Sequence, residues 1–403
     1  MTKGIDKRIL ISGAGPIGLS FALGLKETSL SITIVDQKKR PTIALLEQDT
    51  RMIALSHRSV KFLETINIWQ DLKIYATPIE SVHISEKGYA TKVELFASDH
   101  DLRDFGALIP LGRLVLGMLQ AIDECPNIEY RDETRLADYQ VKQEATHAKG
   151  IHEFAHCTLQ QGHGKSHTKV HEDFDWVVAA EGMNSHLRMI SGIESLHSDY
   201  GQVAVIARAK FENPHHNMAY ERFTSDGPIA LLPVGSHEMA VVMIADSTDK
   251  ERWETALNEV FANEVIYRIG YELGDIEAVT DRHVWDLTLM VPKEVCKPCL
   301  TLIGNSAHSL HPIAGQGLNL GFRDCELLLP YFAGSTIPTL HDLARYQRER
   351  RHDVVKVVGA TDFLVRGFGL DLPGAPQLRN LALRSVNLIG PLKKRIARFG
   401  MGY

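Results

Sequence analysis

"RILISGAGPIGLSFALGLKE", residues 8–27, runs from a short apolar segment through a glycine turn into a longer segment with apolar side chains at helical spacing. Residues 8–12 are typical of a buried strand. Gly13, Gly15 and Gly18 fit the pattern G-x-G-x-x-G, whose glycines allow a tight turn, a close approach of backbone to a pyrophosphate, and close packing of helix on strand. The stretch therefore predicts a dinucleotide-binding turn.

The following segment supports this interpretation. "SITIVD", residues 31–36, has the pattern of a second strand and ends at Asp36, 18 residues beyond Gly18. A carboxylate at this place in a dinucleotide-binding fold accepts hydrogen bonds from the adenosine ribose. These residues predict a dinucleotide cofactor without distinguishing NAD from FAD.

Bulk composition excludes several other classes of protein. The chain has 403 residues, 44% of them hydrophobic and 23% charged, which is enough for two or more globular domains. A net charge of -6 provides no attraction for nucleic acid, and five scattered cysteines do not suggest a disulfide framework. No apolar run approaches the ~18 residues of a spanning helix, and the N-terminus does not resemble a signal peptide. We expect a cytoplasmic protein, with peripheral contact at the inner face of the membrane as an alternative.

Two later segments repeat the passage from strand to glycine to helix. "DWVVAAEGMNSHLR", residues 175–188, predicts a strand that delivers Glu181 and Gly182 to a helix start near Ser185. "GNSAHSLHPIAGQGLNLGFRD", residues 304–324, follows a third strand and predicts a helix from about Gln316. Glycines at this helix start leave the first N–H groups bare, and the positive helix end favours an anion.

Together the three segments resemble the fingerprints of flavoprotein aromatic hydroxylases. The third fingerprint, G-D-x-x-H-x-x-x-P-x-x-G-Q-G-x-N-x-G-x-x-D, matches at nine of its ten fixed positions. The departures are Asn305 in the third segment and Glu181 in the second, where the family has Asp. The resemblance extends to residues 49–69, 108–119 and 220–235, and within the family it favours the ubiquinone-biosynthesis hydroxylases.

This resemblance implies an FAD-dependent monooxygenase with NAD(P)H as a transient reductant. Its reaction would be hydroxylation of the ring of a polyprenylated methoxyphenol by dioxygen, through reduced flavin and a flavin hydroperoxide. Together with the glycine turn, the resemblance implies the following cofactor-binding residues: Gly13, Gly15, Gly18, Asp36, Arg51, Arg113, Glu181, Gly182, Gly304, Asn305, Pro312, Gly315, Gln316, Gly317, Leu318 and Asn319.

The loop before the third helix is where the resemblance places the chemistry. It implies that Pro312 and the glycines after it lie under the flavin ring, with His311 beside them. We take His311 and Pro312 as the candidate catalytic positions and assign no obligate base. His308 and His311 could instead be structural histidines that bond to the backbone. Arg51 and Arg113 could instead be solvated surface residues.

The separation of the three segments along the chain predicts a discontinuous domain. We expect an α/β fold of aromatic-hydroxylase type, with a Rossmann-like FAD-binding domain from residues 1–76, 101–191 and 291–336. Residues 77–100 and 192–290 show strand-like alternation and predict an inserted mixed-sheet domain for the substrate. Residues 337–403 predict a helical C-terminal region.

Two further segments have open interpretations. The histidines of residues 147–171 have a spacing that zinc could use, but the alternation of residues around them favours a hairpin, and we expect no metal. Residues 378–399 form a basic amphipathic pattern that either packs on the protein itself or contacts a membrane or a partner in a biosynthetic complex.

Other functions remain as alternatives. A sister ubiquinone-pathway or other phenol hydroxylase, a flavin halogenase or a reductase would share the FAD-binding fingerprints. A nicotinamide dehydrogenase would not need residues 304–324, and a flavin-bearing scaffold subunit would keep the cofactor only for its fold.

Overall fold

The computed structural model describes residues 7–145, 151–162, 167–310, 316–369 and 390–403. One sheet is built from β1 (Arg8–Ser12), β2 (Ser31–Val35), β8 (Ile128–Arg131), β12 (Trp176–Ala179), β18 (Cys296–Lys297) and β19 (Leu300–Leu302). Its order is β18-β19-β12-β1-β2-β8, and all neighbours are parallel except β18 and β19. Parallel strands are covered on both faces, which explains the continuous apolar runs of β1, β2 and β12.

Helices from distant parts of the chain surround this sheet. The longer ones are α1 (Pro16–Gly24), α3 (His57–Thr65), α5 (Leu111–Asp123), α9 (Gln316–Leu328) and α10 (Ala344–Gly369); α2 (Ile43–Glu47), α4 (Trp69–Leu72) and α6 (His186–Ile190) are short. Proline suits the first position of α1, where its missing N–H costs nothing. Residues 17–23 of this helix are all buried, because α1 packs against both α5 and α9. A helix that is apolar all round is stable only in such a buried position.

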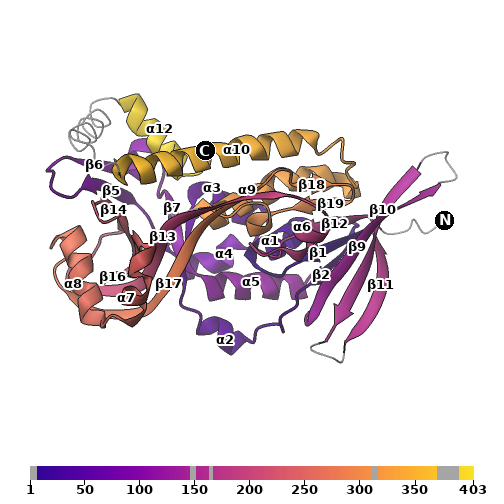
Figure 1. Ribbon diagram of the computed structural model, residues 1–403, viewed down its shortest axis with the longest axis horizontal. Helices are drawn as coiled ribbons and strands as arrows, with labels where there is room; N and C mark the ends of the chain where they lie inside the picture. Colours follow the sequence, from indigo (N-terminus) through magenta and orange to yellow (C-terminus); the bar gives the residue numbers. More distant parts are fainter. Residues whose placement is uncertain (1–6, 146–150, 163–166, 311–315, 370–389) are drawn as a thin grey trace.

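A second sheet contains β5 (Ser81–Glu86), β6 (Lys92–Phe96), β13 (Ser195–Phe211), β14 (Met218–Phe223), β15 (Ile229–Val234), β16 (Glu238–Asp246) and β17 (Ile276–Pro292). The order is β17-β13-β16-β15-β14-β5-β6, antiparallel apart from the β14–β5 pair. Helices α7 (Lys250–Thr255) and α8 (Asn258–Ile269) cover one face, where Trp253, Phe261 and Val265 complete its core. The long strands β13 and β17 run from this sheet towards the six-stranded one (Figure 1).

The other face of the seven-stranded sheet meets a small sheet made of β3 (Met52–Ser56), β4 (Thr77–Pro78) and β7 (Gly106–Pro110). Ala54 and Leu108 of this small sheet pack against Ala219 of β14 and Ala240 of β16. The two large sheets are therefore joined through an apolar contact as well as through the long strands.

Strands β9 (Thr134–Ala145), β10 (Ile151–Gln161) and β11 (Thr168–Phe174) form a separate antiparallel sheet. The pairing of β10 with β11 confirms the hairpin predicted from the alternating residues. His152 lies 2.9 Å from Asp175 and His156 lies 2.6 Å from Asp173. In the described part of the chain, no group of three or more His, Cys, Asp or Glu residues is placed to hold a metal ion.

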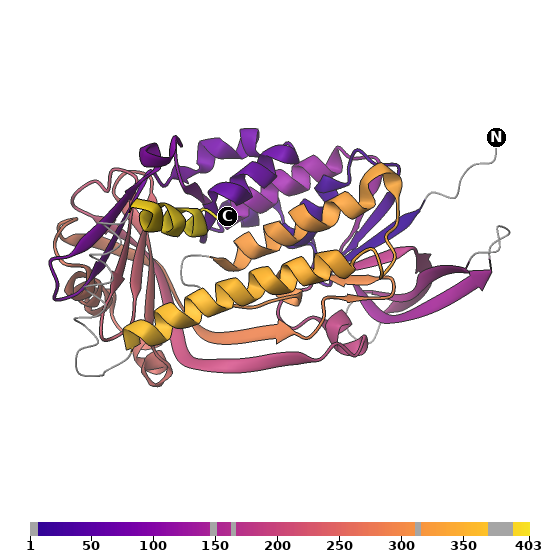
Figure 2. The same ribbon diagram turned by 90° about the horizontal axis from the view of Figure 1, so that it is seen from above.

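Helix α10 runs along the length of the molecule, and α12 (Gly390–Gly400) lies near the β6 end of the seven-stranded sheet (Figure 2). Leu392 and Ile396 of α12 pack against a core formed by Val93 and Leu95 of β6 with Met401. The described part of the amphipathic segment thus turns apolar side chains towards the protein itself. None of the helices in the described ranges is long and apolar enough to cross a membrane.

This packing of α12 has a measurable consequence. We expect Ile396→Ala to lower the free energy of unfolding by about 1–2 kcal/mol, since a partly buried side chain loses apolar contacts. Binding to vesicles of anionic lipid should not change. Val355→Ala is the matched control on α10, because that side chain is 60% exposed, and it should alter stability by less than about 0.5 kcal/mol. A membrane role for this face would give the reverse result, with vesicle binding reduced and stability retained.

Candidate active site

The glycine turn lies at the edge of the parallel sheet where β1, β12 and β19 all end. Gly13 has a φ of +109°, and its N–H donates to the carbonyl of Val35 over 2.8 Å. A Cβ atom added to Gly13 would lie 2.3 Å from the carbonyl oxygen of Ala180, at the start of the second segment. A Cβ on Gly18 would lie 2.0 Å from the Gly13 oxygen. The first and second segments are therefore in direct contact, as close as glycine allows.

Ile17 joins the first segment to the third. A Cβ atom added to Gly304 would meet the Ile17 side chain at 3.2 Å, and one added to Gly321 would meet it at 2.7 Å. Gly304 has a φ of +59° and begins the short 3₁₀ helix η4 (Gly304–Ser306), which follows β19. The chain thus brings residues 13–18 and 304–321 together at the start of α1.

Arg188 completes the contact between the second and third segments. Its side chain is buried, and its guanidinium donates to the carbonyl oxygens of Ser306 over 3.0 Å and Met183 over 2.5 Å. The Ser306 hydroxyl donates to the carbonyl of Gly182 over 3.3 Å. Burial lowers the pKa of Arg188, with Glu181 opposing that change. All three segments predicted from the sequence meet at one edge of the sheet.

Two glycines at this edge leave room for a ligand. Gly15 caps α1 without any side-chain hydrogen bond, in an extended conformation with a φ of -75°. Within the described part of the chain, a Cβ atom added to Gly15 or Gly317 would meet no other heavy atom inside 4 Å. These bare helix starts fit the phosphates and the electron-rich edge of a flavin dinucleotide, because free N–H groups and the helix dipole both favour negative charge there.

The two predicted carboxylates, Asp36 and Glu181, differ in how many hydrogen bonds they already accept from the protein. Asp36 accepts one hydrogen bond at each oxygen, from the N–H groups of Ala14 and Lys38, both over 2.8 Å. Since a carboxylate has about four acceptor positions, Asp36 keeps the capacity to bind ribose hydroxyls.

Glu181 is bonded to its own chain at both oxygens. It accepts from Ser12 Oγ over 2.6 Å, from Ser185 Oγ over 2.7 Å and from the N–H of Leu187 over 2.9 Å. In the structure its carboxylate ties β1 to the start of α6. Its predicted contact with the cofactor would have to coexist with these three bonds.

The two predicted arginines lie near each other, since the N–H of Leu111 donates to the carbonyl of Arg51 over 2.7 Å and α5 begins there. Arg51 makes a two-point ion pair with Asp49, with contacts of 2.8 and 2.6 Å. Arg113 lies 3.0 Å from Glu47 and over the ring of Tyr75. Both retain exposed surface, and their contact with FAD stays a prediction.

The predicted residues of the third segment differ in how far they are exposed and in whether they bond to the protein. Asn305 is exposed on η4, whereas Asn319 is 2% exposed and bonded to the protein. Asn319 accepts from the N–H of Ser56 and the hydroxyl of Ser59, and donates to the carbonyl of Ala54, all within 2.9 Å. Gln316 begins α9 and Leu318 packs partly buried against the core beside it. His311, Pro312 and Gly315 lie outside the described residues.

A buried ionic network supports the third segment. Asp324 is 1% exposed and accepts from the N–H of Gly304 over 2.7 Å and from His308 Nε2 over 2.8 Å. Arg350 of α10 lies 2.5 Å from Asp324 and 2.6 Å from Asp353. Burial alone would raise the pKa of Asp324, but the charges of Arg350 and His308 hold it below its ordinary value. His308 therefore has a structural position here.

Arg350 and Asp353 were not among the site residues predicted from the sequence. Their signal was weak, because arginine and aspartate three residues apart in a charged run also describe a solvated helix face.

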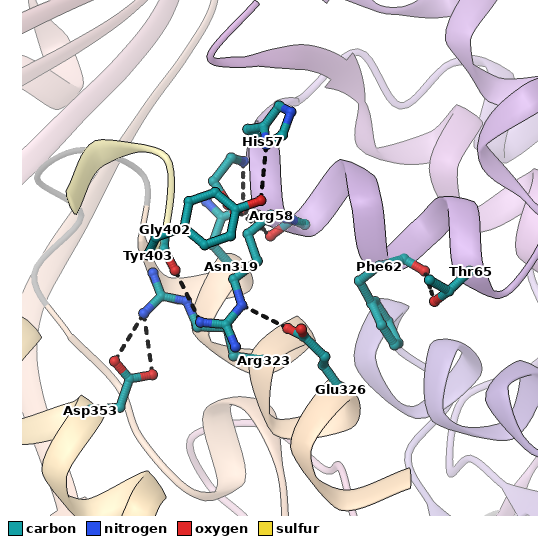
Figure 3. A network of polar contacts seen from close by, with 12 residues as sticks. His57, Arg58, Phe62, Thr65, Asn319, Arg323, Glu326, Asp353, Gly402 and Tyr403 are labelled. Atoms are coloured by element: carbon teal, nitrogen blue, oxygen red, sulfur yellow. Dashed lines mark hydrogen bonds and ion pairs between the residues drawn. The ribbon is translucent and has the colours of Figure 1, made fainter. Parts of the chain in front are cut away.

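The C-terminus contacts the same region (Figure 3). Arg58 of α3 donates to Glu326 of α9 over 2.8 Å and to the carbonyl of Gly402 over 3.1 Å. The Tyr403 hydroxyl lies 3.0 Å from Nδ1 of His57. On the other side, Arg323 of α9 pairs with Asp353 over 3.0 Å. Residues 401–403 are thus bonded to α3, beside the helix that follows the predicted flavin loop.

The geometry described above is the one expected of a flavoprotein whose dinucleotide site is assembled from three segments. A family model described as FAD binding domain matches residues 6–361, and the chain belongs to this family. It is 27% identical to ubiquinone hydroxylase UbiL of Rhodospirillum rubrum over 401 residues, which cover 98% of this chain and 89% of that protein.

A second relative agrees with this assignment, and a solved structure has a similar fold. The chain is 26% identical to 3-demethoxyubiquinol 3-hydroxylase of Escherichia coli, with 98% of each protein covered. Its fold is similar to the crystal structure of p-nitrophenol 4-monooxygenase PnpA from Pseudomonas putida DLL-E4, with a TM-score of 0.75, 15% identity and 98% of each chain covered. The predicted α/β fold and FAD cofactor are confirmed, and the protein is an FAD-dependent aromatic hydroxylase.

Proposed function

We propose that this chain hydroxylates the ring of a polyprenylated methoxyphenol in ubiquinone biosynthesis. The reaction would convert the phenol, dioxygen, NAD(P)H and a proton into the hydroxylated phenol, NAD(P)⁺ and water. The observation that carries the proposal is the match of nearly the whole chain to proteins named as ubiquinone hydroxylases. Within that group, the quoted third segment and residues 220–235 resemble the 2-polyprenyl-6-methoxyphenol hydroxylase.

The parts of the chain would have separate tasks in this reaction. The six-stranded sheet with its helices, from residues 1–76, 101–191 and 291–336, would bind FAD. The seven-stranded sheet, from residues 77–100 and 192–290, would bind the substrate. When bound, FAD supplies the transfer of electrons from NAD(P)H to dioxygen. The chain supplies the bare helix starts at Gly15 and Gly317, the position of the phenol and the exclusion of water.

The sister step at another ring position is the second candidate, because 3-demethoxyubiquinol 3-hydroxylase matches this chain over 98% of both proteins. The ring position depends on how the substrate lies over the flavin, and residues 311–315 contribute to that space by resemblance. A polyprenylated substrate resides in a membrane, so we further propose that the protein acts at the inner membrane face from the cytoplasm.

Quinone precursors in cells that lack this chain distinguish the two steps. We expect a polyprenyl methoxyphenol to accumulate, as measured by mass spectrometry, and the wild-type chain to restore quinone. In vitro, the purified yellow protein should consume NAD(P)H and oxygen only when such a phenol is present. Accumulation of a demethoxyubiquinol would support the sister step. Bound flavin without turnover of any phenol would contradict both and favour a scaffold subunit.

A further inference from the structure

Glu221 lies in the middle of β14, and the alternation of this strand sets the direction of its side chain. Tyr220 belongs to the core shared with α7 and α8, and Arg222 donates to the carbonyl of Ile269 at the end of α8. Adjacent residues of a strand point to opposite faces. The side chain of Glu221 therefore points away from α8, to the other face of the seven-stranded sheet.

That face is the one turned towards the FAD-binding part of the molecule. Ala219, which shares the face with Glu221, packs against Met52 and Ala54 of β3. Ala54 in turn accepts a hydrogen bond from Asn319 in α9, the helix after the predicted flavin loop. The approach to this loop also meets the seven-stranded sheet, since Ser309 pairs with Met290 of β17. The seven-stranded sheet is thus connected to the residues that flank the loop, through Ala54 and Asn319 at one point and through Met290 and Ser309 at another.

The neighbours of Glu221 on this face are apolar. Ile84 of β5 and Ala230 of β15 are its partners across the sheet. Among the residues that the structure describes, none forms a hydrogen bond or ion pair with the Glu221 carboxylate. A carboxylate in apolar surroundings without a partner is costly for the fold, so its presence on this face indicates a role in binding.

Among the described residues, the ionisable groups placed near this face by pairing or packing are Glu86, His308 and Lys393. Glu86 shares the face at the pair with Phe223, and His308 is bonded to Asp324. Lys393 of α12, the helix that packs beside β6, lies 3.5 Å from Asp99. Burial raises the pKa of Glu221 to about 8, and no neighbouring charge contributes to that shift. As a whole residue, Glu221 is partly buried.

We propose that Glu221 is a catalytic residue that accepts the hydroxyl proton of the substrate phenol. This inference rests on the proposed function. One oxygen atom of dioxygen is transferred to the ring carbon: the O–O bond breaks, and the other oxygen atom leaves at the level of water with the two electrons that NAD(P)H supplies. As the new C–O bond forms, ring electrons move towards the transferred oxygen and the phenol O–H bond breaks, with its proton passing to a Glu221 oxygen. A ketone forms at the phenol carbon. Loss of the ring proton to water and return of the Glu221 proton to the ketone oxygen restore the aromatic ring, so the carboxylate is regenerated.

The acidity of the two groups suits this transfer. A free phenol has a pKa of about 10, and a general base is most effective when its own pKa lies near the working pH. Only the ionised carboxylate accepts the proton, so activity should rise with pH through about 8 and then level off.

The test compares Glu221→Gln with Glu94→Gln, both as FAD-loaded protein. Glu94 is a carboxylate on β6 of the same sheet, and it pairs across the sheet with His83, which contacts the ring of Tyr220 on the opposite face. The amide introduced by Glu221→Gln keeps the size of the side chain and does not ionise, so we expect this variant to fold and bind FAD as the wild type does. Its rate of phenol hydroxylation should fall about 100-fold at pH 8.5, and the rise with pH should disappear. Glu94→Gln should retain the wild-type rate of hydroxylation and its rise with pH.

A binding measurement provides a second readout that needs no turnover. Equilibrium dialysis of 2-methoxy-6-prenylphenol against the oxidised wild-type protein should show affinity that rises with pH through about 8. The methyl ether of this probe lacks the hydroxyl and should show no such rise, and neither probe should show it with Glu221→Gln.

The outcomes distinguish a failure of the role of Glu221 from a failure of the proposed function. Phenol turnover by Glu221→Gln at the wild-type rate and with the wild-type pH profile would overturn the role of Glu221 and leave the proposed function intact. Failure of the wild-type protein to bind or hydroxylate any polyprenyl phenol would overturn the proposed function, and the role of Glu221 with it.

Discussion

Replacement of Gly15 by valine should weaken FAD binding about 100-fold or more while the protein still folds. Gly15 has an extended backbone that any residue adopts, and an added Cβ would meet no heavy atom of the described chain within 4 Å. The new side chain would instead occupy the space through which a pyrophosphate approaches α1. Loss of two hydrogen bonds to charged phosphate would cost about 3 kcal/mol or more, which is about 100-fold in Kd. The measurement is FAD titration of the apoprotein, followed by flavin fluorescence.

Gly13→Ala is the matched contrast in the same turn. Its Cβ would lie 2.3 Å from the Ala180 oxygen at a φ of +109°, so the substitution strains the fold itself. We expect Gly13→Ala to lose soluble protein, whereas Gly15→Val should keep the far-ultraviolet circular dichroism of the wild-type apoprotein. If Gly15→Val bound FAD as tightly as the wild type, the phosphates would not lie at this turn.

Arg350→Met should destabilise the protein by about 3–5 kcal/mol, because it leaves Asp324 buried without its charge partner. Methionine keeps most of the side-chain length, so the lost charge dominates the effect. Chemical denaturation at pH 7 measures it. Since the folded pKa of Asp324 lies below its ordinary value of 3.8, the pair stabilises the fold above that pH. The difference between variant and wild type should therefore shrink as the pH falls through the folded pKa.

Arg345→Met is the control for this substitution on the same helix. Its side chain is 79% exposed and pairs with Glu349 at the surface, where ion pairs contribute little. We expect no measurable shift of the unfolding midpoint. An equal loss of stability in both variants would show that the helix, and not the buried pair with Asp324, is responsible.

The parts of the fold that the sequence predicted well are those set by neighbouring residues. Strand, turn and helix in residues 8–27 depend on local spacing and on the glycines, and the structure shows close contacts at Gly13 and Gly18 that only glycine tolerates. The meeting of three distant segments was predicted from their resemblance to the fingerprints of one family. The parallel sheet explains it, because the carboxyl ends of parallel strands share an edge.

Side-chain partners were less predictable, because they depend on residues far away in the chain. Glu181 was assigned to the cofactor, but its carboxylate reaches Ser12, which only the β1–β12 pairing brings near. The amphipathic pattern of α12 is compatible with a membrane surface as well as with a protein core. In the structure, residues of β6 cover its apolar side chains, so this helix packs on the protein itself. Glu221 carried no signal by itself, since a charged residue in an alternating strand normally faces solvent.

A crystal structure of the purified yellow protein would show where its cofactor lies. We expect FAD with its pyrophosphate against the backbone N–H groups at the start of α1, its ribose at Asp36 and its flavin ring towards the start of α9. A flavin bound at another surface of the molecule, with the edge formed by β1, β12 and β19 free of ligand, would contradict the assignment of the three segments to one site.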